Sequence, residues 1–325
     1  MNVSRGLGLA LGFWADRRWG DPARRHPVAG FGMLATRLER AAYADSRVRG
    51  TAYCLALVGG CAGLGVVVER VTRAHPLAHT VVTALATWTV LGGRSLEREA
   101  LAVHDLLERD DLPAARRRLT HLVGRDTSSL SADEVARAVV ESVAENASDA
   151  VTTPLWWGAV AGIPGLVGHR AANTLDAMIG HRSPRYLRFG WASARLDDVL
   201  GLPGARYGGL AVLLASPSTA GVAWRTWRRD ARRHPSPNAG VVEAAFAGAL
   251  GVRLGGTNRY GTRTEERAVL GDGVPVRPDH VPAATDLARR VGLVAMAGAA
   301  AVAVRREGHR PSHPAGLHPR AARSA

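Results

Sequence analysis

Residues 51–68 read TAYCLALVGGCAGLGVVV, eighteen residues without a charged side chain. A helix needs about 20 apolar residues to cross the roughly 30 Å hydrocarbon core of a bilayer. The stretches 76–93, 150–168 and 207–224 are equally free of charge, and 291–304 is a shorter one. The alternative is a set of buried helices in one large soluble domain, but several uncharged stretches of near-spanning length are unusual there. The pattern therefore predicts an all-α fold, a polytopic integral membrane helix bundle with helical cytoplasmic segments.

The apolar stretches predict a single membrane-embedded domain over residues 1–304. Pro154 and Pro164 interrupt one stretch, so it either spans the membrane or re-enters it, because non-helical backbone is tolerated at membrane depth where it lines a cavity. Residues 305–325 are rich in Arg, Pro and His without apolar periodicity, and we expect them to be disordered. The expected spans lie near 51–71, 76–93, 150–168, 207–224 and 288–304, after a short N-terminal helix at 5–15.

Glycines spaced four apart recur in or beside these stretches. Such spacing lets helix backbones approach closely in lipid, where the hydrophobic effect cannot drive helix association. It predicts close helix contacts at the pairs Gly59/Gly63, Gly158/Gly162 and Gly204/Gly208.

All 42 basic residues are arginines, and the net charge is +14. The lack of lysine excludes Schiff-base chemistry and the P-loop lysine of many ATP-binding proteins. Nucleic acid is a poor explanation for the charge, because the arginines flank apolar stretches instead of forming a compact basic domain. Arginine runs near helix ends mark the cytoplasmic side of a membrane protein, so we expect most polar segments to face the cytoplasm.

Residues 132–149 read as a helix that Ser131 or Asp133 can cap. Within it Arg137, Glu141 and Glu145 are spaced four apart and share one face. Asn146 and Asp149 follow, just before an apolar stretch. The stripe is either a solvated ladder of salt bridges or a carboxylate cluster for Mg²⁺, a hard cation that binds oxygen ligands.

Further polar groups follow at the borders of apolar stretches, where polar side chains are costly and tend to be functional. Ser236 to Gly240 open a helix in which Glu243 interrupts an apolar face and needs a partner. Residues 255–260 are expected to form a loop. The remaining polar candidates are Asp21, His26, Arg125, Asp126, Arg170, Asn173, Asp176, Arg195, Asp197, Asp198 and Asn238.

These stretches together resemble the CobD/CbiB family of cobalamin biosynthesis. Nine motifs in chain order, over roughly 16–273, carry the resemblance. They are GDP…HPV at 20–28, GRDT at 124–127, ESxxEN at 141–146, PLW at 154–156, GxPG at 162–165, RAxNTLDxMxG at 170–180, ARxDD at 194–198, SPNAGxxEA at 236–244 and LGGxNxY at 254–260.

The resemblance implies an integral enzyme of the cytoplasmic membrane, an ATP-dependent acid–amine ligase. It implies that adenosylcobyric acid is joined to aminopropanol O-phosphate to give adenosylcobinamide phosphate, with ATP and Mg²⁺ consumed or bound and no tightly held organic cofactor. The implied partners are this corrinoid, the amine, the lipid bilayer and other enzymes of the same pathway, but not nucleic acid. The chain departs from the family where Ala150 follows Asp149, a position commonly held by glycine.

Roles can be assigned to residues on chemical grounds, because carboxylates hold Mg²⁺ and arginine forks bind phosphate. We expect catalytic roles for Glu141, Glu145, Asn146, Asp176 and Asp198. We expect Glu145, Asp149, Asp197 and Asp198 to provide metal ligands. We expect substrate or phosphate contacts from Asp21, His26, Arg125, Asp126, Arg170, Asn173, Arg195, Asn238 and Glu243.

Two other classes of function remain open from the sequence. A membrane transporter would be favoured by inverted repeats, and the sequence holds no convincing internal repeat. A corrinoid-binding or assembly module without its own chemistry would tolerate loss of Glu145. The long polar segments favour an enzyme.

Overall fold

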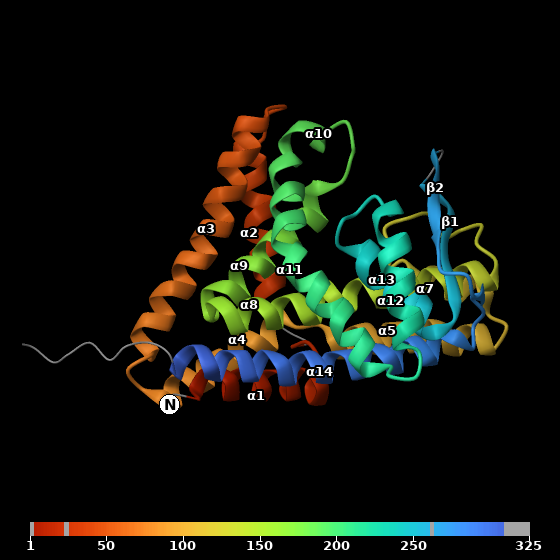
Figure 1. The fold of residues 1–325 in the computed structure, drawn as a ribbon. Helices are drawn as coiled ribbons and strands as arrows, with labels where there is room; N and C mark the ends of the chain where they lie inside the picture. The colour runs from red at the N-terminus through yellow and green to blue at the C-terminus, as the bar shows by residue number, and fades with distance from the viewer. Residues whose placement is uncertain (1–2, 23–25, 261–262, 309–325) are drawn as a thin grey trace, which may run out of the picture.

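The computed structural model describes residues 3–22, 26–260 and 263–308, and it is all-α apart from one small sheet (Figure 1). Disorder was predicted for residues 305–325; 305–308 belong to the helix α14 instead, and 309–325 lie outside the described residues. The helices are α1 Ser4–Trp19, α2 Pro27–Ala42, α3 Arg47–Thr72, α4 Pro76–Val90, α5 Gly93–Glu108, α6 Leu112–Leu119, α7 Ala132–Ala147, η1 Ser148–Thr152, α8 Thr153–Ala161, α9 Ile163–Leu175, η2 Asp176–Gly180, α10 Tyr186–Phe189, α11 Trp191–Ala215, α12 Ala220–Asp230, η3 Ala231–Arg233, α13 Ala239–Leu250 and α14 His280–Gly308.

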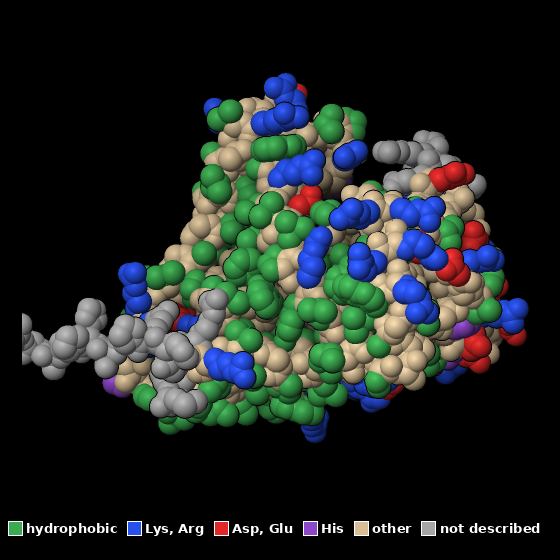
Figure 2. Space-filling view, in the orientation of Figure 1, with side chains coloured by type: hydrophobic (Ala, Val, Ile, Leu, Met, Phe, Trp, Pro, Cys, Tyr) green, Lys and Arg blue, Asp and Glu red, His purple; other side chains and the backbone are tan. Residues whose placement is uncertain are grey.

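Among the described residues, two helices are long and apolar enough to cross a membrane: α3, over Arg47–Thr72, and α14, over His280–Arg305. Each stretch has 26 residues, or about 39 Å at 1.5 Å per residue. Their most apolar windows are only 28% and 33% buried, whereas the core helix of a soluble protein is mostly buried. Exposed apolar side chains cover much of the face seen in Figure 2, so these two helices indicate association with a membrane.

The helices observed differ from three other expected spans, those at 207–224, 76–93 and 150–168. The span at 207–224 is wrong, because α11 ends at Ala215 and the chain turns before α12 begins at Ala220. The stretch 76–93 contains α4, whose 15 residues reach about 22 Å, shorter than the hydrocarbon core. A polytopic bundle of five spans is therefore not what the described helices show by length and composition.

The stretch 150–168 is broken between α8 and α9 at Gly162, whose φ of +72° favours glycine. Both prolines lie in the first turns of these helices, where proline is tolerated. The Glu69 carboxylate on α3 pairs with Arg5 on α1 and accepts a hydrogen bond from Ile163 N at 2.8 Å. This buried pair joins α1 and α3 to the start of α9.

Two of the three glycine pairs lie at helix contacts. A Cβ on Gly204 or Gly208 would collide with the hydroxyl of Thr153 or Thr152, respectively. A Cβ on Gly158 would collide with Leu9. Gly59 and Gly63 instead face open space, where an added Cβ would meet no described atom within 4 Å, and α3 meets α9 through Gly65. The prediction for Gly59/Gly63 is wrong for contacts within the chain.

Residues 255–260, expected to form a loop, belong to strand β1 Val252–Tyr260. It pairs antiparallel with β2 Arg263–Leu270 and parallel with β3 Val274–Pro275. The register shifts between Leu254 and Gly256, and Gly255 and Gly256 have φ of +85° and +92°. Positive φ at glycine is typical of a β-bulge, which aims a strand in a new direction. The resulting hairpin projects beside α7 and α13 (Figure 1).

Candidate functional site

The site is built on α7, which begins as the sequence predicts. Ser131 Oγ accepts the N–H of Glu134, and the Glu134 carboxylate accepts the N–H of Ser131, which is a complete capping box. At its other end α7 passes into the π-helical turn η1, which carries Asp149. A second π-helical turn, η2, begins at Asp176. Single π turns inside α-helices are frequent at functional sites.

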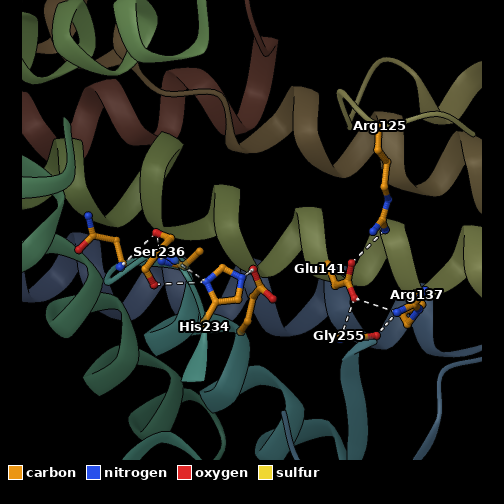
Figure 3. A network of polar contacts seen from close by, with 9 residues as sticks. Arg125, Arg137, Glu141, His234, Ser236 and Gly255 are labelled. Atoms are coloured by element: carbon orange, nitrogen blue, oxygen red, sulfur yellow. Dashed lines mark hydrogen bonds and ion pairs between the residues drawn. The ribbon is translucent and has the colours of Figure 1, made fainter. Parts of the chain in front are cut away.

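Glu141 joins three separate segments of the chain (Figure 3). Its carboxylate accepts a hydrogen bond from Arg125 Nη2 at 2.9 Å and another from Gly255 N at 2.9 Å. Arg137, one turn earlier on α7, lies 3.8 Å from the same carboxylate and donates to the carbonyl of Gly255. Glu141 is buried, and these contacts make it a residue that positions the hairpin and Arg125.

Glu145 and Glu243 lie further inside, within electrostatic range of each other. Burial raises the pKa of Glu145, and the Arg267 guanidinium on β2 lowers it. Burial raises the pKa of Glu243 well above its ordinary value, and the carboxylates of Glu141 and Glu145 add to the effect. Glu145 keeps some accessible surface although protein surrounds its carboxylate.

Four aspartates continue the acidic group beyond Glu145. Burial raises the pKa of Asp149 well above its ordinary value, and Asp197 and Glu145 raise it further. Burial and the charge of Asp176 raise the pKa of Asp197 to about 7. Burial and the charge of Asp198 raise the pKa of Asp176 to about 6. Acids from η1, η2 and α11, distant in sequence, thus lie within electrostatic range of one another.

The acidic group fits a cation that is shared with a phosphate. Among the residues that the structure describes, no three His, Cys, Asp or Glu side chains lie close enough together to hold a metal ion alone. Mg²⁺ commonly binds one or two carboxylates plus phosphate oxygens, so a ready-made cage is not required. Asn173 hydrogen-bonds the Asp197 carboxylate, whose Oδ1 is buried and has no hydrogen-bond partner in the described part of the chain. Asp197 and Asp149 are therefore the residues best placed to hold Mg²⁺.

Arg170 faces the acidic group from α9. Its pKa is lowered by burial, and the carboxylates of Asp21 and Asp149 oppose this effect. His26 caps α2, accepting the N–H of Val28 at Nδ1, 3.1 Å away, while its Nε2 lies 3.9 Å from Asp21. Burial lowers the pKa of His26. Asp21 and His26, predicted near the start of the chain, therefore lie near Arg170 of the central motifs.

Other predicted residues lie at the edge of the site and hold its shape. Asn238 donates to the carbonyl of Asp198 at 2.8 Å and accepts from Arg206. Arg195 is exposed and pairs with Asp198 at 3.2 Å. Asp126 accepts the N–H of Ser128 in a local turn, and Asn146 donates to the carbonyl of Ser142 within α7.

Two residues of the site were missed from the sequence. Arg267 lies on the strand that follows the expected loop, and its charge lowers the pKa of both Glu145 and Glu243. His234 is buried, with Nε2 3.6 Å from Glu243, so it is the partner that the buried acid requires. In the sequence, His234 could have been noticed because it lies just before the SPNAG motif. Arg267 could not, because nothing near it in the sequence indicates that β2 pairs with β1.

Comparison with known proteins gives consistent matches. The sequence model of the family described as CobD/Cbib protein matches residues 9–288. The cobalamin biosynthesis protein CobD of Mycobacterium tuberculosis (strain ATCC 25618 / H37Rv) is 51% identical over 307 residues, 93% of this chain and 95% of that protein. The proteins of the same name from Geobacter metallireducens and Rhodobacter capsulatus are 48% and 44% identical, covering 81% and 92% of this chain and 85% and 93% of their own. No solved structure matches the chain.

Proposed function

Because the chain belongs to the CobD/CbiB family of cobalamin biosynthesis, we propose that it is an adenosylcobinamide-phosphate synthase. The reaction joins a propionate carboxylate of adenosylcobyric acid to the amine of aminopropanol O-phosphate, with ATP and Mg²⁺. The protein acts in the cell membrane as a multi-pass protein, with its site open to the cytoplasm. The observation that carries the proposal is the convergence of Glu145, Asp149, Asp176 and Asp197 from separate helices next to arginines.

The chemistry explains why acids and arginines are needed together. A carboxylate does not react with an amine until it is activated. In the proposed first step a carboxylate oxygen of the corrinoid attacks the γ-phosphorus of ATP, and ADP leaves. In the second step the amine attacks the acyl carbon, an amide C–N bond forms, and inorganic phosphate leaves. Both steps depend on positioning and on stabilisation of negative charge.

Named residues supply these functions. Arg170 and Arg267 bind phosphate oxygens, because the planar guanidinium matches them. Asp197 and Asp149 would hold Mg²⁺, which when bound would neutralise charge on the phosphates. Glu145 accepts the proton that the amine releases, since a buried acid with a raised pKa is a better base near neutral pH.

The test is an assay of the full chain in detergent with adenosylcobyric acid, aminopropanol O-phosphate, ATP and Mg²⁺. We expect the amide, with ADP and phosphate in equal amounts. Formation of AMP would contradict the phosphoryl-transfer step. A membrane transporter or an assembly module without its own chemistry would form no amide at all. Positional isotope exchange in ATP, with the corrinoid present and the amine withheld, would support an acyl phosphate.

A further inference from the structure

Helix α12 has an inner face and an outer face of different chemistry. Ala223, Thr226 and Asp230 are buried, and Ala223 lies so close to Gly248 of α13 that a Cβ there would be 2.7 Å from its Cα. The outer face exposes Trp224 and Arg228, together with Arg225. A short helix with tryptophan and arginine on its exposed side is typical of a helix that lies in a membrane interface.

The helix before α12, α11, contacts α14 where the uncharged stretch of α14 begins. Arg290 Nη1 donates to the carbonyl of Ala215, the last residue of α11, at 2.9 Å. The uncharged stretch of α14 begins at the next residue, Val291, so this contact marks the border of the apolar surface. α12 begins five residues after Ala215. On α11, Leu210 and Leu214 follow Arg206 by one and two helical turns and are 50% and 69% exposed.

Tryptophans and arginines at this border contact one another. The rings of Trp224 and Trp227 are 5.2 Å apart, edge to face, and the Arg228 guanidinium lies 5.6 Å from the centre of the Trp224 ring. Tryptophan is enriched where a membrane protein passes from hydrocarbon to water. In Figure 2 basic side chains gather beside the apolar surface in this region.

A hollow beside α12 gathers positive charge without any acid. It has a volume of about 530 Å³ and is lined by nine residues, among them Arg206, Arg228, Arg232 and Trp227. Neither Arg228 nor Arg232 forms an ion pair within the described part of the chain, whereas Arg229 and Arg233 are paired with Asp230. Two exposed guanidiniums and a third at the rim of one hollow match a phosphodiester oxygen pair.

We infer that this hollow binds the phosphodiester head group of an anionic phospholipid, with the acyl chains lying along Leu210 and Leu214. Arg228 and Arg232 contact the phosphate, and Trp227 packs against the glycerol. Each arginine near an anionic membrane surface adds to the attraction for the phosphate. The inference needs the membrane but not the amide-forming reaction, so its failure would leave the proposed enzyme activity untouched.

The experiment counts lipids bound to the full chain in a neutral detergent by native mass spectrometry. Phosphatidylglycerol and phosphatidylcholine are added separately at the same concentrations. We expect about tenfold stronger binding of phosphatidylglycerol by the wild type, and a loss of at least fivefold in that preference in the double variant Arg228→Gln/Arg232→Gln. The matched control Arg98→Gln/Arg109→Gln removes the same charge from exposed positions on α5 and just after it, and should keep the preference.

The outcomes separate the possible ligands. Equal binding of the two lipids, or an unchanged preference in the Arg228→Gln/Arg232→Gln variant, would overturn the inference. Displacement of phosphatidylglycerol by millimolar ATP or inorganic phosphate would also overturn it, in favour of a soluble phosphate ligand. Both arginines are exposed, so the variant should fold, and an unchanged thermal midpoint checks this. If the midpoint falls, the single variant Arg232→Gln carries the same test.

Discussion

Glu141 Oε1 accepts the backbone N–H of Gly255 at 2.9 Å, and this bond fastens the β-hairpin to α7 together with those that Arg137 donates to the carbonyls of Gly255 and Thr257. The same carboxylate pairs with Arg125, so Glu141 contacts both the hairpin and the loop that carries Arg125. Because the hairpin carries Arg267, Glu141 influences the distance between the Arg267 guanidinium and Glu145 without a hydrogen bond to either.

We predict that Glu141→Gln loosens the hairpin while keeping an acceptor for Gly255. Removing one charge of a buried pair costs about 3–5 kcal/mol, because Arg125 loses the carboxylate charge to which it is hydrogen-bonded. Hydrogen exchange should speed up at residues 252–256, and the melting temperature should fall. Glu108→Gln, at an exposed position on α5, is the control and should change neither. Unchanged exchange in the hairpin would show that Glu141 does not anchor it.

We predict that Asp197→Asn lowers the rate of amide formation about a hundredfold, since a lost metal contact removes several kcal/mol of charge stabilisation. The asparagine keeps the shape of the side chain, so the protein should still fold. Raising the Mg²⁺ concentration should restore part of the rate. Asp105→Asn, an exposed change on α5, should leave the rate alone. A rate that falls without any change in Mg²⁺ dependence would remove Asp197 from the metal site.

The acidic group predicts opposite effects of pH on stability and on metal binding. The pKa values of Asp176 and Asp197 are raised to about 6 and about 7, mainly by burial. The folded state therefore holds protons that the unfolded state releases above pH 4, and the free energy of unfolding falls as pH rises from 4 to 7. Mg²⁺ binding displaces these protons, so its affinity should rise by up to about tenfold per pH unit over the same range.

Thermal unfolding at pH 5 and pH 8, with EDTA or with Mg²⁺, measures both effects. Mg²⁺ should raise the melting temperature most at pH 8. Burial lowers the pKa of His169 to about 3, which stabilises the protein as pH rises, so the contribution of Asp197 is measured against the variant Asp197→Asn. In EDTA the change from pH 5 to pH 8 should lower the melting temperature of the wild type more, or raise it less, than that of Asp197→Asn, since an amide does not titrate. An equal change in the two proteins would contradict the assignment.

We predict that Gly65→Ala destabilises the contact between α3 and α9. A Cβ at Gly65 would lie 2.6 Å from Pro164 Cα, and overpacking of this kind costs about 1–3 kcal/mol. Gly63→Ala on the same helix meets open space and should be neutral or slightly stabilising, because alanine favours helix. The two melting temperatures in the same detergent make the comparison. Equal values would show that α3 and α9 do not pack closely at Gly65.

Local signals in the sequence predicted much of the site. The cap at Ser131 and the spacing of Glu141 and Glu145 depend only on residues a few positions apart, so α7 is predictable from its own residues. Asp149 and Asp197 were both expected to be metal ligands on chemical grounds, and the charge of Asp197 raises the pKa of Asp149, so the two acids lie within electrostatic range.

What the sequence could not show depended on pairing over longer distances. The strand at 252–260 lacks clear alternation, because two glycines with positive φ form its bulge. The helix α14 is longer than the sequence predicts, since Asp286 reads as an interruption of the apolar pattern. In the structure Asp286 pairs with Arg289 and Arg290 within the helix, so these charges are satisfied and the helix continues from His280.

The position of Arg267 late in the chain has a consequence for biosynthesis. Glu145, Asp149, Asp176 and Asp197 all precede β2 in the chain, so a nascent chain that stops short of β2 holds these acids without this counter-ion. Until the last fifth of the polypeptide is made, Arg125 opposes the raised pKa of Glu145 and Arg170 that of Asp149 without help from Arg267. Translation itself thus sets the moment at which the enzyme gains its charge balance.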